Sequence, residues 1–488
     1  MISGQPWPRP PTVPPEVAEA AGVVAAAVEH APRPDTGPCG RYPDGRCPAR
    51  RPTPTVGFGE WLGRPERWSG VIRTEVLPSG LSLVTEPMAD ARSVCIGFWV
   101  GTGARDEEIS QAGSSHFLEH LLFKGTATRS PSAIAEAVDE VGGDFNAFTT
   151  KEYTSFYIRL LAEHLPLGLD ILSDIMWQPA LRPDDLEAER QVILDEILMH
   201  ADEPSDEAAE QSSALLFPDH PLGREVLGSQ ESVSAMTAER IREFFDRHYR
   251  PGNMVVAVAG DMEHDSVADG LEARFSGPTG GVTPDRRPPG DNVAPVAFTR
   301  RATEQAHVVL AARSVDRFDH RRYALAVLNH VLGGGLSSRL FQEIRERRGL
   351  AYSVWSERVA YHDAGSVSVG MGTAPEHVAE VLDIVSDELA RLGADGITER
   401  ELTIAKGNLR AETLLACEDS GARMSRIGAG LLLHGEVLSV DDVLGRVQAL
   451  TLEEVHAAAT ELVGAPRTLS VVGPFDGSEF DTDSLRLG

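Results

Sequence analysis

Two histidines and a glutamate stand within five residues in the segment 114-SSHFLEHLLFKGT-126, inside an otherwise apolar run. On a helix, His116 and His120 are four residues apart, so both imidazoles project from one face, with Glu119 beside them. Two neutral imidazoles suit Zn²⁺, and a catalytic zinc ion commonly has three protein ligands and an open position for water. The segment therefore predicts two zinc ligands on one helix and a third from elsewhere. The alternative is that both histidines only cap the helix or pair with nearby acids.

The sequence predicts a second helix over residues 184–201, which contains 189-ERQVILDEILMH-200. Zinc accepts a carboxylate oxygen beside two imidazole nitrogens. Acids of this helix are therefore candidates for the third ligand. Spacing alone leaves four acids open for that role: Glu187, Glu189, Asp195 and Glu196.

The order H-x-x-E-H reverses the H-E-x-x-H of many zinc peptidases and is the inverzincin signature. A glutamate, Glu196, follows 76 residues after His120. The motif and this interval resemble the pitrilysin/insulinase-type zinc metallopeptidases, in particular the branch of the mitochondrial processing peptidase. The resemblance covers about residues 70–475 of the chain.

The resemblance implies a role for each residue of the motif. One Zn²⁺ per chain would be bound by His116, His120 and Glu196. Glu119 would be the general base. Glu189 would be a supporting acid that contacts the zinc ligands without binding the metal itself. The implied reaction is zinc-dependent hydrolysis of a peptide bond, in which Glu119 takes a proton from water and passes it to the leaving amine.

A second stretch, 142-GGDFNAFTTKEYTSFY-157, resembles the edge strand with which this family pairs an extended peptide substrate. Asn146, Ala147 and Phe148 occupy the matching positions. Adding a strand to the edge of a sheet holds a peptide by its main chain, with little regard for its side chains. The alternative is an ordinary hairpin with Asn146 in a turn.

The second half of the chain contains 333-GGGLSSRLFQEIRERRGLAYS-353, which resembles the family's glycine-rich segment and its arginine and tyrosine pair. Arg345 and Tyr352 match the residues that reach the substrate carbonyl or the developing oxyanion. The glycines do not form a phosphate loop, because the Gly-Lys-Ser/Thr ending is absent. Taken alone, Arg345 is typical of a solvated helix face.

Acidic residues follow the second helix in 202-DEPSDEAAE-210. In processing peptidases, acids at about this distance receive an arginine of the substrate, and Asp206 and Glu210 are the matches. We therefore expect cationic peptide substrates with Arg or Lys near the cleaved bond. The alternative is a solvated acidic face.

The elements that must position these residues form two similar halves. Strand and helix patterns alternate through residues 71–275 and begin again after a Gly/Pro-rich linker over 276–295, so that 296–488 repeat the order. The segments 250-RPGNMVVAVAGD-261 and 465-APRTLSVVGPFD-476 close the two halves in the same way. The predicted fold is α+β, with two homologous-looking α/β-sandwich halves, each a mixed sheet covered by helices.

The duplication also predicts that only the first half binds metal. A shift of 210 residues places Ala326 under His116 and Asn329 under Glu119. The second half is therefore expected to be metal-free and to hold substrate. Two residues are left open under the zinc-binding glutamate, Lys406 and Glu412.

The first 70 residues hold 14 of the 32 prolines. Proline fixes φ and removes a backbone donor. We therefore expect residues 1–70 to form a disordered or extended tail.

The chain carries 45 Lys and Arg against 74 Asp and Glu, a formal charge of −29. Such a field repels nucleic acid and attracts cationic peptides. No apolar run reaches the roughly 18 residues needed to span a membrane, and the apolar segment 21–30 lacks the basic flank of a signal peptide. We therefore expect a cytoplasmic protein.

The organisation of the active molecule is left open by the sequence. A chain with both the zinc half and the Arg/Tyr half works as a homodimer, or as a heterodimer with a metal-free sister subunit. The resembled family also includes non-catalytic scaffold subunits, which typically lose part of H-x-x-E-H, so the intact motif favours an enzyme. A zinc-binding chaperone that holds peptides without cutting them is a further alternative.

Overall fold

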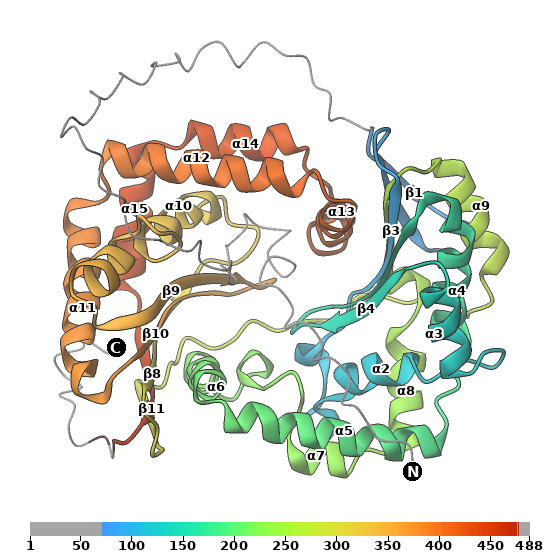
Figure 1. Cartoon of the computed structure of the whole chain (residues 1–488), viewed down its shortest axis with the longest axis horizontal. Coiled ribbons are helices and arrows are strands. Elements are labelled where there is room, and N and C mark those ends of the chain that lie inside the picture. Colours follow the sequence, from blue (N-terminus) through green and yellow to red (C-terminus); the bar gives the residue numbers. More distant parts are fainter. Residues whose placement is uncertain (1–70, 476, 478–488) are drawn as a thin grey trace, which may run out of the picture.

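The computed structural model describes residues 71–475 and residue 477. The predicted tail over residues 1–70 lies outside the described residues. The described chain forms two α/β halves, each built on one mixed sheet (Figure 1). The α+β fold with two similar halves is therefore confirmed.

The sheet of the first half has six strands in the order β1-β2-β6-β3-β5-β4. The neighbours β2 and β6 are parallel, and the other neighbouring pairs are antiparallel. The strand β4 lies at one edge of this sheet, paired with β5. The bounds are Arg73–Val76 for β1, Ser82–Pro87 for β2, Ser93–Val100 for β3, Asp144–Thr149 for β4, Thr154–Leu161 for β5 and Met254–Gly260 for β6.

The sheet of the second half repeats this pattern with five strands in the order β7-β11-β8-β10-β9. The neighbours β7 and β11 are parallel, like β2 and β6, and the others are antiparallel. The edge strand β9 thus corresponds to β4, and the shared strand order shows the internal duplication. The bounds are Val296–Arg300 for β7, Ala306–Ser314 for β8, Ala351–Ala360 for β9, Gly365–Thr373 for β10 and Arg467–Gly473 for β11.

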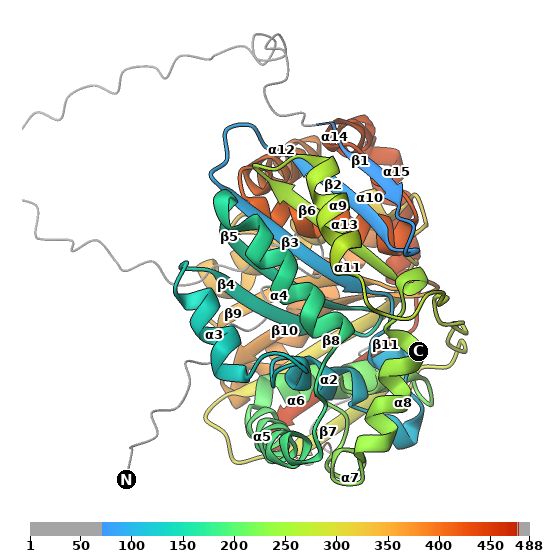
Figure 2. The ribbon, with the colours of Figure 1, turned by 90° about the vertical axis from the view of Figure 1, so that its right-hand side faces the viewer.

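On the face of its main hydrophobic core, the first sheet is covered by helices of the first half that include α4 and α9 (Figure 2). Local signals begin them: the Ser130 side chain caps α3 ahead of a proline, and the Thr237 side chain caps α8. The bounds are Ser114–Leu122 for α2, Pro131–Asp139 for α3, Leu165–Trp177 for α4, Pro183–Asp202 for α5, Pro204–Leu216 for α6, Gln230–Ser234 for α7, Ala238–His248 for α8 and His264–Arg274 for α9.

The second half has its own set of helices, of which α12 and α15 begin with capping boxes. The sequence patterns did not predict α13, α14 and α15. None of the helices in the described residues combines the length and apolar content that crossing a bilayer requires. The bounds are Arg322–Leu332 for α10, Val378–Asp395 for α11, Glu399–Ala416 for α12, Ser420–His434 for α13, Val440–Ala449 for α14 and Leu452–Gly464 for α15.

Each half contributes one helix to the other half. The helix α6 packs on β8 and β11 of the second sheet, and α13 packs on β2, β3 and β6 of the first (Figure 1). Under α13, the indole N–H of the fully buried Trp99 donates to the sulfur of Met424 at 3.3 Å. The exchange covers the second face of each sheet, so the two halves share their cores.

The segment between α9 and β7 connects the halves, from the end of α9 at Arg274 to the start of β7 at Val296. Because α6 and α13 cross over, neither half builds all of its core from its own residues. The exact limits 71–275, 276–295 and 296–488 stay predictions.

Candidate metal centre

The helix α2 begins where the backbone turns through Gly113, whose φ of 92° is rare for a residue with a side chain. The carboxylate of Glu107 accepts the N–H groups of Gly113 at 2.7 Å and of Ser115 at 2.6 Å. It thereby satisfies donors that the start of a helix leaves unpaired. Burial raises the pKa of Glu107 to about 7, and these hydrogen bonds partly offset the rise. The buried Phe117 and Leu121 fix the helix in the core.

The second helix of the site is α5, which packs against α2. Glu189, Ile193 and Glu196 are spaced by four and three residues, so they share one face of α5. Ile193 is fully buried in the core, which turns this face inward. Arg190 holds the helix from another side by donating to the carbonyl of Met236 at 2.7 Å.

Side-chain atoms of His116, His120 and Glu196 converge between the two helices. Glu196 Oε2 lies 3.6 Å from Nε2 of His116 and 3.7 Å from Nε2 of His120. Ligand atoms around a tetrahedral zinc ion, with bonds of about 2.0–2.1 Å, are about 3.4 Å apart. The donor types and their spacing therefore fit zinc. In the described part of the chain, this is the one group of three such residues close enough to hold a metal.

The protonation of the two histidines is set by their surroundings. Burial lowers the pKa of His116 well below its ordinary value, and the nearby His120 adds to the effect. His116 is therefore neutral, the form in which imidazole binds a metal. Burial also acts to lower the pKa of His120, but its hydrogen bond to Glu189 and the charges of Glu119 and Glu196 raise it overall. The acids around His120 thus favour the protonated, positively charged form of its imidazole.

Glu189 holds His120 from the side away from the cluster. Its Oε2 lies 3.0 Å from Nδ1 of His120, and its Oε1 lies 2.6 Å from Nζ of Lys124. An Nδ1–H donated to a carboxylate leaves Nε2 free to face a metal. Lys124 was not predicted from the sequence. Its place four residues after His120, one helical turn along, is the signal that could have indicated it.

Glu119 lies beside the cluster without belonging to it. Its Oε2 accepts a hydrogen bond from Thr149 Oγ1 at 2.6 Å. Desolvation raises the pKa of Glu119, and the hydrogen bond from Thr149 partly offsets this rise. A carboxylate with a raised pKa beside a metal site has the properties of a general base. No pattern in the sequence pointed to Thr149.

The predicted substrate-binding residues lie in the middle of β4, so Asn146 is in a strand and not in a turn. Asn146 Oδ1 accepts the N–H of Ala147 at 2.8 Å. Phe148 is buried, with its ring centroid 5.8 Å from that of Trp99. Phe148 can therefore offer a substrate only its backbone. The substrate contacts themselves stay predictions.

Arg345 and Tyr352 lie together in the second half, in the π-helical segment Phe341–Arg347 and at the start of β9. The guanidinium carbon of Arg345 is 4.7 Å from the ring centroid of Tyr352 and 4.8 Å from that of Phe341. The side chain of Tyr352 is exposed. Between residues 71 and 475, no hydrogen bond, ion pair or ring contact joins this pair to the metal-type cluster, which consists of His116, His120 and Glu196. Their catalytic role stays a prediction.

Asp206 and Glu210 lie one helical turn apart on α6. Asp206 Oδ2 is 3.4 Å from Nδ1 of His200. Desolvation raises the pKa of Glu210 to about 7, and the charges of Glu225 and Asp206 add to this rise. A cationic side chain placed among these acids would relieve their repulsion. Recognition of arginine at this place stays a prediction.

The residues that the predicted duplication places under the motif lie in α10. Ala326 and Asn329 are buried there, and His330 follows them. Lys406 of α12 donates to two backbone carbonyls at 2.7 Å. The choice between Lys406 and Glu412 as the counterpart of the zinc-binding glutamate stays open.

Two duplicated α/β halves, with a cluster of two histidines and a glutamate in one of them, define a two-domain protein with a candidate metal site. The family description "Insulinase (Peptidase family M16)" matches residues 83–230, and "Peptidase M16 inactive domain" matches residues 235–409. The chain therefore belongs to peptidase family M16.

Curated relatives are similar over nearly their whole length. An uncharacterized zinc protease of Streptomyces coelicolor is 44% identical over 425 residues, which cover 85% of this chain and 92% of the relative. An uncharacterized zinc protease of Bacillus subtilis is 35% identical over 404 residues, which cover 83% of this chain and 98% of the relative. The names of these relatives thus specify zinc and proteolysis but no substrate.

Solved structures share the fold. The peptidase M16 inactive domain from Pseudomonas fluorescens has a TM-score of 0.77 at 23% identity, covering 83% of this chain and 98% of that chain. A protease from Helicobacter pylori has a TM-score of 0.77 at 22% identity, covering 83% of this chain and 100% of that chain. These likenesses show the two-half architecture.

Proposed function

We propose that the protein is a zinc-dependent endopeptidase of the processing-peptidase type, which cleaves extended, cationic peptides held between its two halves. The observation that carries this proposal is the convergence of His116, His120 and Glu196, with Glu119 beside them and hydrogen-bonded to Thr149. Membership of family M16 and the zinc protease names of the relatives support this reaction class.

The chemistry follows from the positions of the acids. One zinc ion per chain, held by His116, His120 and Glu196, would supply Lewis acidity toward water and toward the peptide carbonyl. Glu119 takes a proton from the attacking water and passes it to the leaving amine nitrogen. Glu189 accepts Nδ1–H of His120, so Nε2 of that ring stays available for ligation.

The substrate would be held by residues of both halves. An extended peptide adds to the free edge of β4 along the backbone of Asn146, Ala147 and Phe148. Arg345 and Tyr352 donate to the developing oxyanion from the second half. Their mutual stacking supports this role, because it orders the guanidinium before substrate arrives.

The proposal also covers the charge of the substrate and the assembly of the protein. Asp206 and Glu210 receive an Arg or Lys side chain near the cleaved bond, supported by the mutual repulsion that raises the pKa of Glu210. The cytoplasmic location and the pairing with a second copy or a sister subunit remain predictions.

The test of the proposed function is the Glu119→Gln variant. A peptide library is incubated with each protein, with and without a zinc chelator, and bound zinc is measured. We expect cleavage by the wild type that the chelator abolishes, and one zinc ion per chain in both proteins. The variant should have a kcat about 10²- to 10⁴-fold lower, because general base catalysis contributes that much.

The matched control is Glu187→Gln, an exposed acid of α5 that pairs with Arg190, and it should cleave like the wild type. Near wild-type cleavage by Glu119→Gln would remove the assignment of the base. A wild-type protein without zinc would favour the non-catalytic scaffold subunit. A wild-type protein that binds zinc and peptide without cleavage would favour the chaperone.

A further inference from the structure

The edge strand β4 ends at Thr149, and the turn that follows it is closed by hydrogen bonds. Thr149 pairs with Thr154 of β5, and the N–H of Thr150 donates to the carbonyl of Tyr153 at 2.8 Å. The hydroxyl oxygen of Thr150 also accepts the N–H groups of Glu152 and Tyr153. The backbone of Thr149 is therefore held at the end of a tight hairpin.

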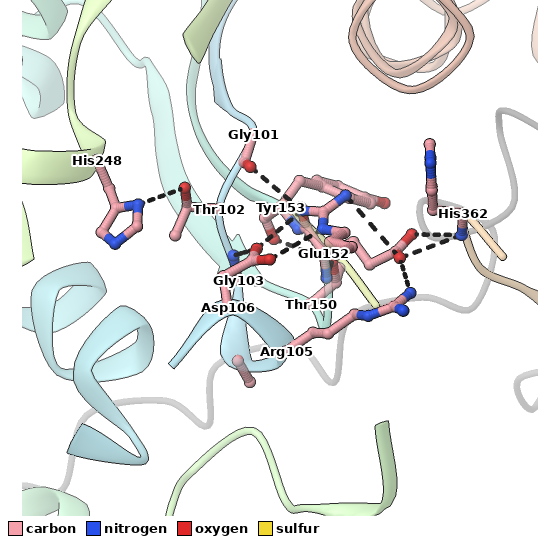
Figure 3. Close-up of polar contacts among 12 residues, drawn as sticks. Gly101, Thr102, Gly103, Arg105, Asp106, Thr150, Glu152, Tyr153, His248 and His362 are labelled. Carbon is pink, nitrogen blue, oxygen red and sulfur yellow. Dashed lines mark hydrogen bonds and ion pairs between the residues drawn. The ribbon is translucent and has the colours of Figure 1, made fainter. Parts of the chain in front are cut away.

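Ion pairs and hydrogen bonds of Glu152 fix the hairpin turn to both halves. The Glu152 carboxylate pairs with Arg105 at 2.6 Å and accepts the N–H of His362 at 3.1 Å (Figure 3). It also pairs with Arg317. The N–H of Arg105 also donates to the carbonyl of Lys151 in the same turn at 2.7 Å. Thr149 therefore stands on a rigid support.

The side chain of Thr149 points from this support to Glu119. Its hydroxyl donates to Oε2 of Glu119 at 2.6 Å. Glu119 is close enough to His120 and Glu196 for the charges of both to act on its pKa. A carboxylate free to rotate there could turn into the cluster and become a further metal ligand. With Oε2 engaged, Oε1 is the oxygen left to accept a proton.

We infer that Thr149 is a positioning residue that holds Glu119 as a general base and keeps it out of the metal-ligand set. This inference rests on the proposed peptidase function. Because Thr149 ends the strand to which the substrate is proposed to pair, one strand sets both the register of the peptide and the orientation of the base.

The test compares Thr149→Val, which keeps the shape and removes the donor, with Thr149→Ser, which keeps the donor. Thr149→Ala is a second donor-free variant in case the valine variant does not fold. We expect both donor-free variants to lower kcat about 10- to 100-fold, because the lost hydrogen bond is to a charged group. KM should change less than about twofold, and one zinc ion per chain should remain, because the substrate strand and the ligands are intact.

The serine variant should restore at least half of the wild-type kcat. The matched control is Thr74→Val on the exposed strand β1, which should behave like the wild type. Three results would each overturn the inference: wild-type kcat in the donor-free variants, equal losses for serine and valine, or loss of zinc from the donor-free variants.

A second readout does not require peptidase activity. In a double-mutant cycle with Glu119→Ala, Thr149→Val should lower the Tm when Glu119 is present and leave it unchanged when Glu119 is absent. A wild type without cleavage would contradict the proposed function alone. Equal Tm changes in both backgrounds would contradict the role of Thr149 alone.

Discussion

Glu189 contacts both Lys124 and His120, so it links the lysine to the metal-type cluster. Burial acts to raise the pKa of Glu189, but the hydrogen bonds to His120 and Lys124 lower it overall. Glu189 is therefore ionised and able to accept Nδ1–H of His120. Groups behind a metal ligand set its tautomer and orientation, and their loss commonly weakens metal binding about 10- to 100-fold.

A Lys124→Met variant should therefore bind zinc about tenfold more weakly, because Glu189 loses the cation that orients it. Competition with a chromophoric zinc chelator measures this affinity. The control is Lys406→Met, which removes a lysine that donates to backbone carbonyls in the second half. Equal zinc affinity in the Lys124→Met protein and the wild type would show that Glu189 holds His120 without help from Lys124.

Site residues that are close together in the sequence could be predicted, whereas contacts between distant residues could not. The spacing of His116 and His120 was sufficient to place both imidazoles on one face of α2. Spacing left four acids open on α5, and the family resemblance selected Glu196. Thr149 and Lys124 were not predicted, because each acts on a residue of another element.

At the scale of elements, α13 fits the sheet of the other half through small residues and charges. A Cβ on Gly428 would come within 2.4 Å of Nε1 of Trp99. Glu86 of β2 pairs with Arg423 at 2.6 Å and with Arg426 at 3.0 Å. The exchange of helices thus depends on close backbone approach and on a buried carboxylate.

A Gly428→Ala variant should lower the free energy of unfolding by about 1–3 kcal/mol, because an added methyl group overpacks a close contact. Trp99 is fully buried, and its indole N–H already contacts Met424 of the same helix. The matched control is Gly407→Ala in α12, where no atom lies within 4 Å of an added Cβ. This control should raise stability by about 0.5–1 kcal/mol. Urea unfolding measures both, and a neutral Gly428→Ala change would contradict the packing of α13.

At the scale of the whole molecule, one buried ionic cluster joins the two halves and the segment between them. Arg105 pairs with Glu152 and also with Asp363 at 2.6 Å, and Arg286 pairs with Asp106 at 2.8 Å. The side chains of Arg105 and Glu152 are each only 2% exposed. With the exchange of α6 and α13, this cluster restricts relative movement of the halves.

The cluster makes stability depend on pH in a defined direction. Burial acts to raise the pKa of Glu152, but the charges of Arg317 and Arg286 lower it overall from its ordinary value of 4.5. A carboxyl group with a lowered pKa stabilises the fold above its unfolded pKa, and this contribution is lost as the pH falls through the folded value.

A Glu152→Gln variant should therefore lose about 3 kcal/mol of stability at pH 7, because it leaves buried arginines without their carboxylate. The difference from the wild type should shrink as the pH falls below the ordinary value of 4.5. Urea unfolding across this pH range measures the effect. The control is Glu461→Gln, which removes an exposed partner of Arg321 and should change stability little. Equal stability of Glu152→Gln and wild type at pH 7 would contradict a stabilising role of the cluster.

The sequence by itself determined what depends on neighbours along the chain. Alternating and helical periodicities, with caps and Gly/Pro turns, predicted most strands and most helices, and the repeated order predicted two similar halves. The strand β7 was not predicted. Backbone geometry places residues four apart on one helix face, so the two histidines of the motif were predictable together.

Only the tertiary structure decided which distant groups meet. It placed Glu119 against Thr149, brought Glu196 to the two imidazoles, and exchanged α6 and α13 between the sheets. The physical reason is that helix and strand geometry follow from local backbone preferences, whereas contacts between elements arise from the close packing of whole surfaces. No short sequence pattern encodes that packing.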